Sequence, residues 1–411
     1  MAAVDVEKAM KIEEDSSVMK NRGNTKKKQR KSLILPRFGC FRLDDESPTV
    51  DRKYDDGSID MVSAGALEDR TDPTHLIVMV NGIIGSAQDW RYAAKHFLKA
   101  YPQEVVVHCS ERNTSTLTFD GIDIMGERLA DEVISVIQRY PNLCKISFIG
   151  HSLGGLIARY AIALLYGGNY LNRISKLDGE IGSNGSTKVS PEENFISKIA
   201  GLQPVNFITV ATPHLGSRGH NQVPMFCGFH TLELVARQLS WFLGRTGRHL
   251  FLTDEDKGKP PLLLRMVTDC EGLPFLSALQ SFNRCVAYAN VRFDQLVGWS
   301  TSSLRLENEL PKRRNFLKND KYRHIVNEEM GVVSGPERAL TLEYGWKNMR
   351  TRELMNEMIK GLTRVRWERV DVKFGGGRYR LLAHNSIQVQ TYCVHSAGAD
   401  VIQHLIDNFV L

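Results

Sequence analysis

Short apolar segments alternate with amphipathic segments from residue 75 onward, and this order limits the folds open to the chain. Residues 76–80 form an unbroken apolar run, as in a strand buried on both faces of a parallel sheet. Regular alternation of such strands with helices predicts a right-handed βαβ array. We therefore expect an α/β fold, with a mostly parallel sheet and helices on both faces. The expected strands are 76–80, 105–108, 146–149, 205–210, 285–291 and 367–374, and the expected helices are 89–100, 122–140, 152–166 and 399–410.

Composition separates a leader from the folded region. Residues 1–70 are charged and poor in aromatic residues, so we expect a disordered leader. Nine Lys or Arg residues and no acidic residue stand between Lys20 and Arg42, which makes this leader basic. Residues 71–411 are expected to form one domain, with insertions at about 167–200, 215–280 and 305–365. The second insertion is predicted as a helical cap and the third as mostly helical.

The segment Gly150-His151-Ser152-Leu153-Gly154 fits the pattern Gly-x-Ser-x-Gly and lies between an expected strand and an expected helix. A nucleophile elbow requires this strand–turn–helix context. Glycines two positions before and after the serine let the strand and helix backbones pass closely in a strained turn. The serine Oγ then projects at a helix N-terminus, where backbone N–H groups favour negative charge. We therefore predict that Ser152 is a nucleophile.

An oxyanion hole for this nucleophile would consist of two backbone amides. The first is the N–H of Leu153, directly after the serine. The second is expected in the loop 80–85, at the N–H of Ile83, because glycines on both sides of it allow the backbone to turn toward the serine.

The general base must be one of twelve histidines. Hydrolases with this elbow carry the serine, the acid and the histidine in that order along the chain, so we expect the base near the C-terminus. His384 lies in a polar segment between the last expected strand and the closing helix, and it is the first candidate. His395, His404 and His214 are the alternatives, with a structural or supporting role favoured for the last two.

The acid partner is expected just after a late strand, at the carboxyl edge of the sheet. Asp294 follows the strand expected at 285–291. An aspartate in that place holds the imidazole tautomer and stabilises its cation. Asp269, Asp254 and Asp256 are alternatives in surroundings that resemble a sheet less.

Four further residues are candidates for the substrate pocket: Ile84, His151, His214 and Leu215. Of these, His214 follows the strand expected at 205–210, whose end points to the same crevice. The expected cap is rich in large apolar residues, which suggest an acyl-binding surface and hence a lipid or long-chain ester. Packing of these side chains against the body of the protein is an equally good interpretation. They are Phe226, Phe229, Trp241, Phe242 and Leu243.

These motifs in this order resemble the lipase-like serine esterase family of plants and fungi, which belongs to the α/β-hydrolase superfamily. The resemblance covers about residues 72–300, together with Ala383-His384-Asn385 and Gly398-Ala399-Asp400, and it leaves out the leader. It implies Ser152 as nucleophile, Asp294 as acid and His384 as base. One departure concerns the oxyanion loop: related lipases usually have His-Gly where this chain has Asn81-Gly82, which puts the bracing of the loop in question.

The resemblance implies a carboxylesterase or lipase that works through a Ser-Asp-His triad and an acyl-enzyme. A thioesterase or amidase would use the same triad, and a catalytically inactive scaffold would keep the same fold. No metal or organic cofactor is implied.

The expected partners are a lipid or other ester substrate and, through the basic run 26–31, an anionic membrane surface. A nuclear address and a solvated tail are the alternatives for this run. No nucleic-acid partner is expected. The chain shows neither an N-terminal apolar h-region nor an apolar run of the roughly 18 residues that a membrane helix requires. We therefore expect a cytoplasmic protein, with membrane association through the leader as an option.

Overall fold

The computed structural model describes residues 49–53, 59–63, 72–168, 197–217, 243–255, 258–270, 272–333, 346–377 and 381–411. Residues Asp45–Leu411 form one compact unit. The other unit, Met1–Asp44, lies outside the described residues together with the basic run 26–31.

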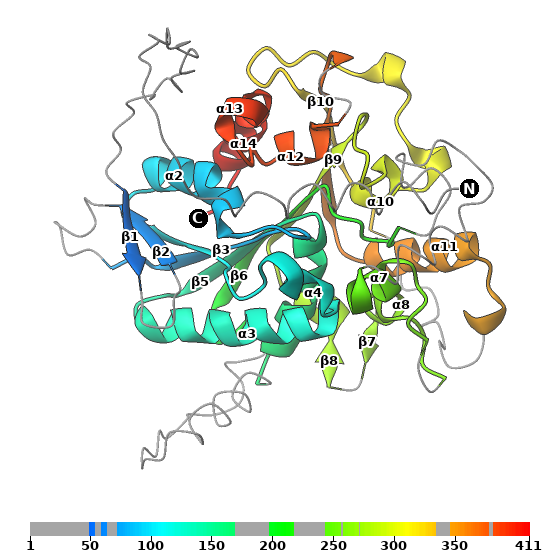
Figure 1. Ribbon diagram of the computed structural model, residues 1–411, viewed down its shortest axis with the longest axis horizontal. Coiled ribbons are helices and arrows are strands. Elements are labelled where there is room, and N and C mark those ends of the chain that lie inside the picture. Colours follow the sequence, from blue (N-terminus) through cyan, green and yellow to red (C-terminus); the bar gives the residue numbers. More distant parts are fainter. Residues whose placement is uncertain are drawn as a thin grey trace, which may run out of the picture. The chain divides into compact units, whose positions relative to one another are not determined.

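A nine-stranded sheet forms the centre of the compact unit (Figure 1). Its strands are β1 (Thr49–Lys53), β2 (Ile59–Ser63), β3 (His75–Val80), β4 (Val105–Cys109), β5 (Lys145–His151), β6 (Gln203–Val210), β9 (Arg284–Asn290), β10 (Ile325–Met330) and β11 (Trp367–Val372). They are arranged in the order β1-β2-β4-β3-β5-β6-β9-β11-β10. The strands from β4 to β11 in this order run parallel, whereas β1, β2 and β10 pair antiparallel at the two edges.

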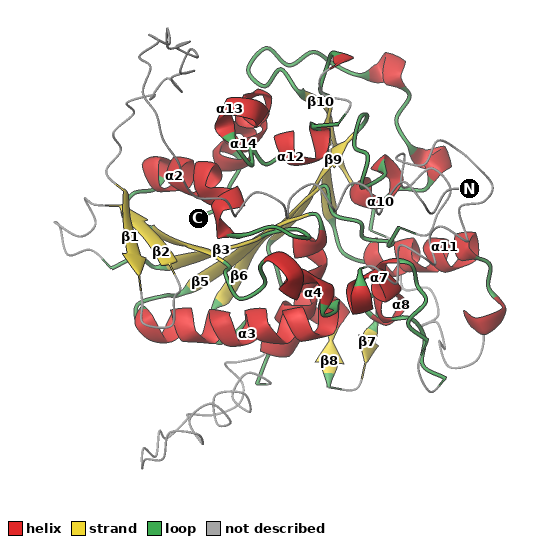
Figure 2. Cartoon of the chain, in the orientation of Figure 1, coloured by secondary structure: helices red, strands yellow, loops and turns green. Residues whose placement is uncertain are grey.

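Helices cover both faces of the sheet (Figure 2). Those described are α2 (Arg91–Ala100), α3 (Ile122–Arg139), α4 (Leu153–Leu165), α7 (Gly244–Leu250), α8 (Leu262–Arg265), α9 (Phe275–Gln280), α10 (Trp299–Ser303), α11 (Thr351–Leu362), α12 (Ala383–Ser386), α13 (Tyr392–His395) and α14 (Ala399–Asp407). Within these ranges, no helix has both the length and the apolar composition to cross a bilayer.

The side chains of β3 alternate between two faces that are both buried, which explains why its sequence is continuously apolar. Successive side chains of a strand point to opposite faces. Leu76 and Val78 join the core that also contains the buried faces of α3 and α4, whereas Ile77 and Met79 join the core shared with α2 and α14. Both faces are therefore buried, and the expected α/β fold with a mostly parallel sheet is confirmed.

The expected boundary between leader and domain, at residues 70 and 71, is placed too late in the chain. Strands β1 and β2 precede it and pair with each other and with β4. Strand β2 could not be predicted from the sequence because Asp60, which is buried in the structure, is of a residue type that usually lies at the surface. In the structure Asp60 Oδ1 lies 2.6 Å from His108 Nδ1, and His108 Nε2 lies 3.0 Å from Glu132 Oε1. Arg139 adds a second cation beside Asp60.

This buried group fixes the charge of an interior histidine. Both ring nitrogens of His108 face carboxylates, so both carry protons. Burial alone would lower the pKa of His108, but its hydrogen bonds to Asp60 and Glu132 raise it to about 9. Strand β2 is thus joined to β4 and α3 through the two charged contacts of His108.

The three expected insertions are described only in part. Residues 169–196 and 218–242 lie outside the described residues, and with them Phe226, Phe229, Trp241 and Phe242 of the expected cap. Within 243–280, helix α9 packs on α4, and Phe275 and Leu276 belong to the core, so this part is body rather than cap. The region 305–365 is less helical than expected, because it contributes the edge strand β10, short 3-10 turns and a single described α-helix, α11.

Candidate active site

Ser152 stands in a strained turn between β5 and α4. Its backbone has φ 53° and ψ −125°, a region that residues with a side chain rarely occupy. The turn is fixed by its surroundings, because Ser152 N–H donates to the Val210 carbonyl at 2.8 Å. A side chain at Gly154 would place its Cβ 2.2 Å from the Val80 carbonyl oxygen. Glycine at this position therefore allows α4 to start directly against the end of β3.

A histidine and an aspartate form a buried pair at the same edge of the sheet. His384 Nδ1 lies 2.9 Å from Asp294 Oδ2, and both side chains are buried. The carboxylate also accepts hydrogen bonds from Asn290 Nδ2 at 2.9 Å and from the backbone amides of Leu296 and Val297 at 3.0 and 2.8 Å. Burial would raise the pKa of Asp294, but the charge and hydrogen bond of His384 and the bonds from Asn290 and Val297 hold it below its usual value.

The pair sets the tautomer of the imidazole. Because the ionised carboxylate of Asp294 only accepts hydrogen bonds, the proton of a neutral His384 ring lies on Nδ1 and the lone pair on Nε2. That nitrogen is the one a general base needs. His384 was expected in a polar loop, but it lies in the short helix α12.

His151, the residue before the serine, contacts the segment that carries His384. Its Nε2 donates to the backbone carbonyl of His384 at 2.8 Å, and the centroids of the two rings are 4.6 Å apart. Burial, followed by the charge of His384, lowers the pKa of His151 to about 3. The ring therefore remains neutral and holds α12 against the end of β5. The sequence named His151 only as a pocket candidate and gave no sign of this bond.

The loop after β3 packs directly on the serine. A Cβ at Gly82 would lie 3.0 Å from Ser152 Cβ. Asn81 Nδ2 donates to the Asn113 carbonyl at 2.9 Å and to the Gly82 carbonyl at 3.2 Å. The asparagine that replaces the usual histidine thus ties the loop to the segment after β4, which answers the question of its bracing.

The amides of this loop differ in their hydrogen bonding. Ile84 N–H donates to Thr118 Oγ1 at 2.9 Å. For the N–H groups of Ile83 and Leu153, the described part of the chain supplies no acceptor. Both remain predictions for the oxyanion hole. The side chain of Ile84, which stays a pocket prediction, is 64% exposed.

Two other pocket candidates lie in the interior. The side chains of His214 and Leu215 are fully buried. His214 Nε2 lies 3.0 Å from Thr209 Oγ1, and its ring meets the ring of Trp367 edge-on. Burial, with the charge of Arg159 acting in the same direction, holds the pKa of His214 well below its usual value. This placement supports packing and does not support contact with substrate.

The alternatives for the base and the acid have other partners. Among the described residues, none of them bonds to His384 or Asp294, and Asp256 is not described. His395 contacts Thr391, and His404 contacts Tyr288 and Glu328. Asp269 accepts hydrogen bonds from the first turn of α9, and Asp254 accepts one from the backbone of Leu262. No group of three or more His, Cys, Asp or Glu side chains within the described ranges is placed to hold a metal ion.

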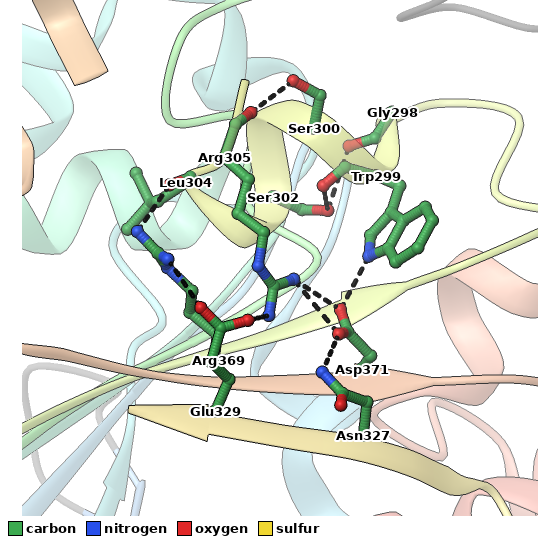
Figure 3. A network of polar contacts seen from close by, with 10 residues as sticks. All are labelled: Gly298, Trp299, Ser300, Ser302, Leu304, Arg305, Asn327, Glu329, Arg369 and Asp371. Carbon is green, nitrogen blue, oxygen red and sulfur yellow. Dashed lines mark hydrogen bonds and ion pairs between the residues drawn. The ribbon is translucent and has the colours of Figure 1, made fainter. Parts of the chain in front are cut away.

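A buried polar network, which the sequence did not reveal, anchors the segment after Asp294 (Figure 3). Asp371 of β11 accepts from Trp299 Nε1 at 2.6 Å and from Arg305 Nη1 at 2.9 Å. Arg305 also pairs with Glu329 at 3.0 Å. Asp371 and Arg305 are fully buried, where an unpaired charge would be costly. The network therefore joins α10, which follows the Asp294 loop, to the strand that precedes the His384 segment.

The parallel sheet, the strained serine between β5 and α4 and the buried His–Asp pair at the same edge define an α/β-hydrolase. The family model described as "Putative serine esterase (DUF676)" matches residues 70–304, and the chain belongs to this family, as its motifs predicted.

Two relatives of this chain carry lipase names. "Putative lipase ROG1" of Saccharomyces cerevisiae is 32% identical over 269 residues, which are 63% of this chain and 33% of that protein. "Putative lipase C4A8.10" of Schizosaccharomyces pombe is 24% identical over 241 residues, 57% of this chain and 26% of that protein. The chain thus spans about a third or less of the length of these relatives. Among solved structures, carboxyl esterase 2 of Tuber melanosporum aligns with a TM-score of 0.33 and 11% identity over 63% of this chain and 73% of that one.

Proposed function

We propose that this protein is a serine hydrolase that cleaves carboxylic esters, with Ser152 as nucleophile, His384 as general base and Asp294 as the acid that orients the base. The observation that carries the proposal is the buried 2.9 Å contact between His384 Nδ1 and Asp294 Oδ2, at the sheet edge where the strained Ser152 stands. Family membership supports the same chemistry.

The reaction follows from these roles. His384 Nε2 takes the proton of Ser152 as Oγ attacks the ester carbonyl, and the amides of Ile83 and Leu153 stabilise the oxyanion. The imidazolium, stabilised by Asp294, then gives its proton to the leaving alcohol. Water hydrolyses the acyl-enzyme by the same steps in reverse order, which restores the serine.

Exposed apolar side chains on the segments at this side of the sheet favour an apolar acyl chain. Ile84 after β3, Leu117 after β4, Leu296 after β9 and Leu381 before α12 are 64%, 43%, 41% and 79% exposed. All four lie on segments that leave or approach the carboxyl edge of the sheet, which is the edge of Ser152. The lipase names of the relatives agree with a lipid or long-chain ester.

Matched substrates test the proposal. Purified protein should hydrolyse p-nitrophenyl esters, with a rate that depends on acyl length, and Ser152→Ala should abolish turnover while the protein stays folded. Faster turnover of the corresponding thioester or anilide would assign the same triad to a thioesterase or an amidase. A folded wild type that turns over none of the three would favour an inactive scaffold.

A further inference from the structure

A pocket lies at the N-terminal ends of β9 and β11, the side of the sheet opposite to the strand ends near Ser152. Its volume is about 400 Å³, which falls within the usual range of small-molecule sites, about 300–1,000 Å³. Arg284, the first residue of β9, and Glu368, the second residue of β11, are part of its lining. Because Asp294 follows the other end of β9, the length of that strand, about 20 Å, separates the two sites.

The side chains that line this pocket carry an excess of positive charge. The lining includes three arginines, Arg284, Arg364 and Arg366, and one acidic residue, Glu368. Arg284 Nε lies 2.9 Å from both carboxylate oxygens of Glu368, and its Nη2 lies 2.5 Å from one of them. These two charges neutralise each other. Arg364 and Arg366 have no side-chain hydrogen bond or ion pair with any described residue, so two positive charges remain.

The two unpaired arginines are held on a fixed segment. Val365 between them is buried in the core, and Trp367 directly after them is buried at the start of β11. The Arg364 carbonyl also accepts a hydrogen bond from Gln280 Nε2 at 3.2 Å. The backbone that carries both guanidinium groups is therefore already ordered, so less of it must be ordered on binding.

We propose that this pocket binds a phosphomonoester group. Such a group carries close to two negative charges at pH 7, which matches the two unpaired guanidinium groups, and the planar guanidinium fork fits phosphate oxygens in pairs. A carboxylate or a phosphodiester carries a single charge and would balance only one of the two positive charges. Met330 and Val333, which are 47% and 49% exposed in the lining, offer an apolar contact for the rest of the ligand.

The first test is calorimetric titration of the full chain with inorganic phosphate. Arg364→Gln/Arg366→Gln should weaken phosphate binding roughly tenfold or more, since it removes charge-assisted hydrogen bonds. The matched control is Arg313→Gln/Arg314→Gln, which removes the same charge from two exposed arginines outside the pocket. It should stay within about twofold of wild type. Should the double pocket variant fail to fold, Arg366→Gln, at an exposed position, replaces it.

Equal weakening in the pocket variant and the control would contradict the proposal, because it would indicate general attraction to a basic protein. The absence of saturable binding to wild type would contradict it as well. Ser152→Ala should bind phosphate as wild type does, since the pocket is separate from the active site; a loss in that variant would count against the proposal.

A second measurement separates a lipid from a soluble source of the phosphate. Flotation with vesicles of phosphatidylcholine containing phosphatidate, compared with phosphatidylcholine alone, presents the group on a membrane. Weaker flotation of the pocket variant than of the control would identify a lipid head group. Equal flotation of the two, with phosphate binding lost only in the pocket variant, would identify a soluble phosphomonoester.

Discussion

His151 donates a hydrogen bond to the backbone carbonyl of His384, so the residue before the nucleophile holds the segment of the base. The two lie 233 positions apart in the chain and meet because β5 and α12 reach the same edge of the sheet. The elbow and the His–Asp pair are thus parts of one rigid arrangement.

Removing this bond should slow catalysis more than it weakens substrate binding. His151→Phe keeps a ring in place but leaves the His384 carbonyl without its donor, so kcat should fall roughly tenfold while KM changes little. Steady-state kinetics with a p-nitrophenyl ester provide the measurement, and a thermal melt shows whether the variant is folded. A folded variant with unchanged kcat would show that His151 has no positioning role.

Gly154 should not tolerate a methyl group. In Gly154→Ala the new Cβ would lie 2.2 Å from the Val80 carbonyl oxygen, so either α4 or the oxyanion loop must move. We expect ester hydrolysis to be lost and the free energy of unfolding to fall by about 1–3 kcal/mol. Gly375→Ala is the matched control, because a Cβ there meets no atom within 4 Å. Comparable urea denaturation curves for the two variants would refute the expectation.

The sequence predicted the elements that position the site better than the contacts within it. The apolar run at 76–80 and its counterparts predicted the parallel strands, because a strand buried on both faces has no polar positions. Motif and order predicted Ser152, Asp294 and His384 as the triad, and the structure brings the last two into contact. The bonds made by His151 and Asn81 could not be predicted, because they join segments far apart in the chain through a carbonyl group that every residue has.

Charged side chains within two strands explain the errors at the edges of the sheet: Asp60 in β2 is buried, whereas Glu328 and Glu329 in β10 are exposed. Asp60 in β2 and Glu328 and Glu329 in β10 made both strands read as loop or helix. Asp60 is compensated by His108 and Arg139, and Glu329 by Arg305 and Arg369. A pattern of apolar residues contains no sign of such pairing.

The contacts of His108 predict a pH dependence of stability. Its pKa is about 9 in the folded chain and near 6.5 when unfolded. The bound proton therefore stabilises the fold fully below pH 6.5, and this contribution, on the order of 3 kcal/mol, is lost as the pH rises through about 9. Urea denaturation between pH 6 and pH 10 should show a steeper loss in wild type than in Asp60→Asn, where one partner of His108 is neutral. Parallel profiles would contradict this account.

Two deletions distinguish the basic leader from the folded unit. Removing residues 1–44 should leave turnover of soluble esters within about twofold of the full chain and weaken binding to anionic vesicles, because the basic residues there attract acidic lipid. Removing residues 1–70 also deletes β1 and β2 and the Asp60 partner of His108, so it should lower the unfolding midpoint as well. Unchanged vesicle binding after the shorter deletion would reject the lipid interpretation of the run 26–31.

Covalent capture of Ser152 tests the central claim most directly. Intact-mass spectrometry after treatment with a fluorophosphonate should show one added phosphonyl group, and peptide mapping should locate it on Ser152. Asp294→Asn should be labelled far more slowly, since the carboxylate no longer holds the His384 tautomer. A folded wild type that acquires no label, or a label on a residue other than Ser152, would contradict the account.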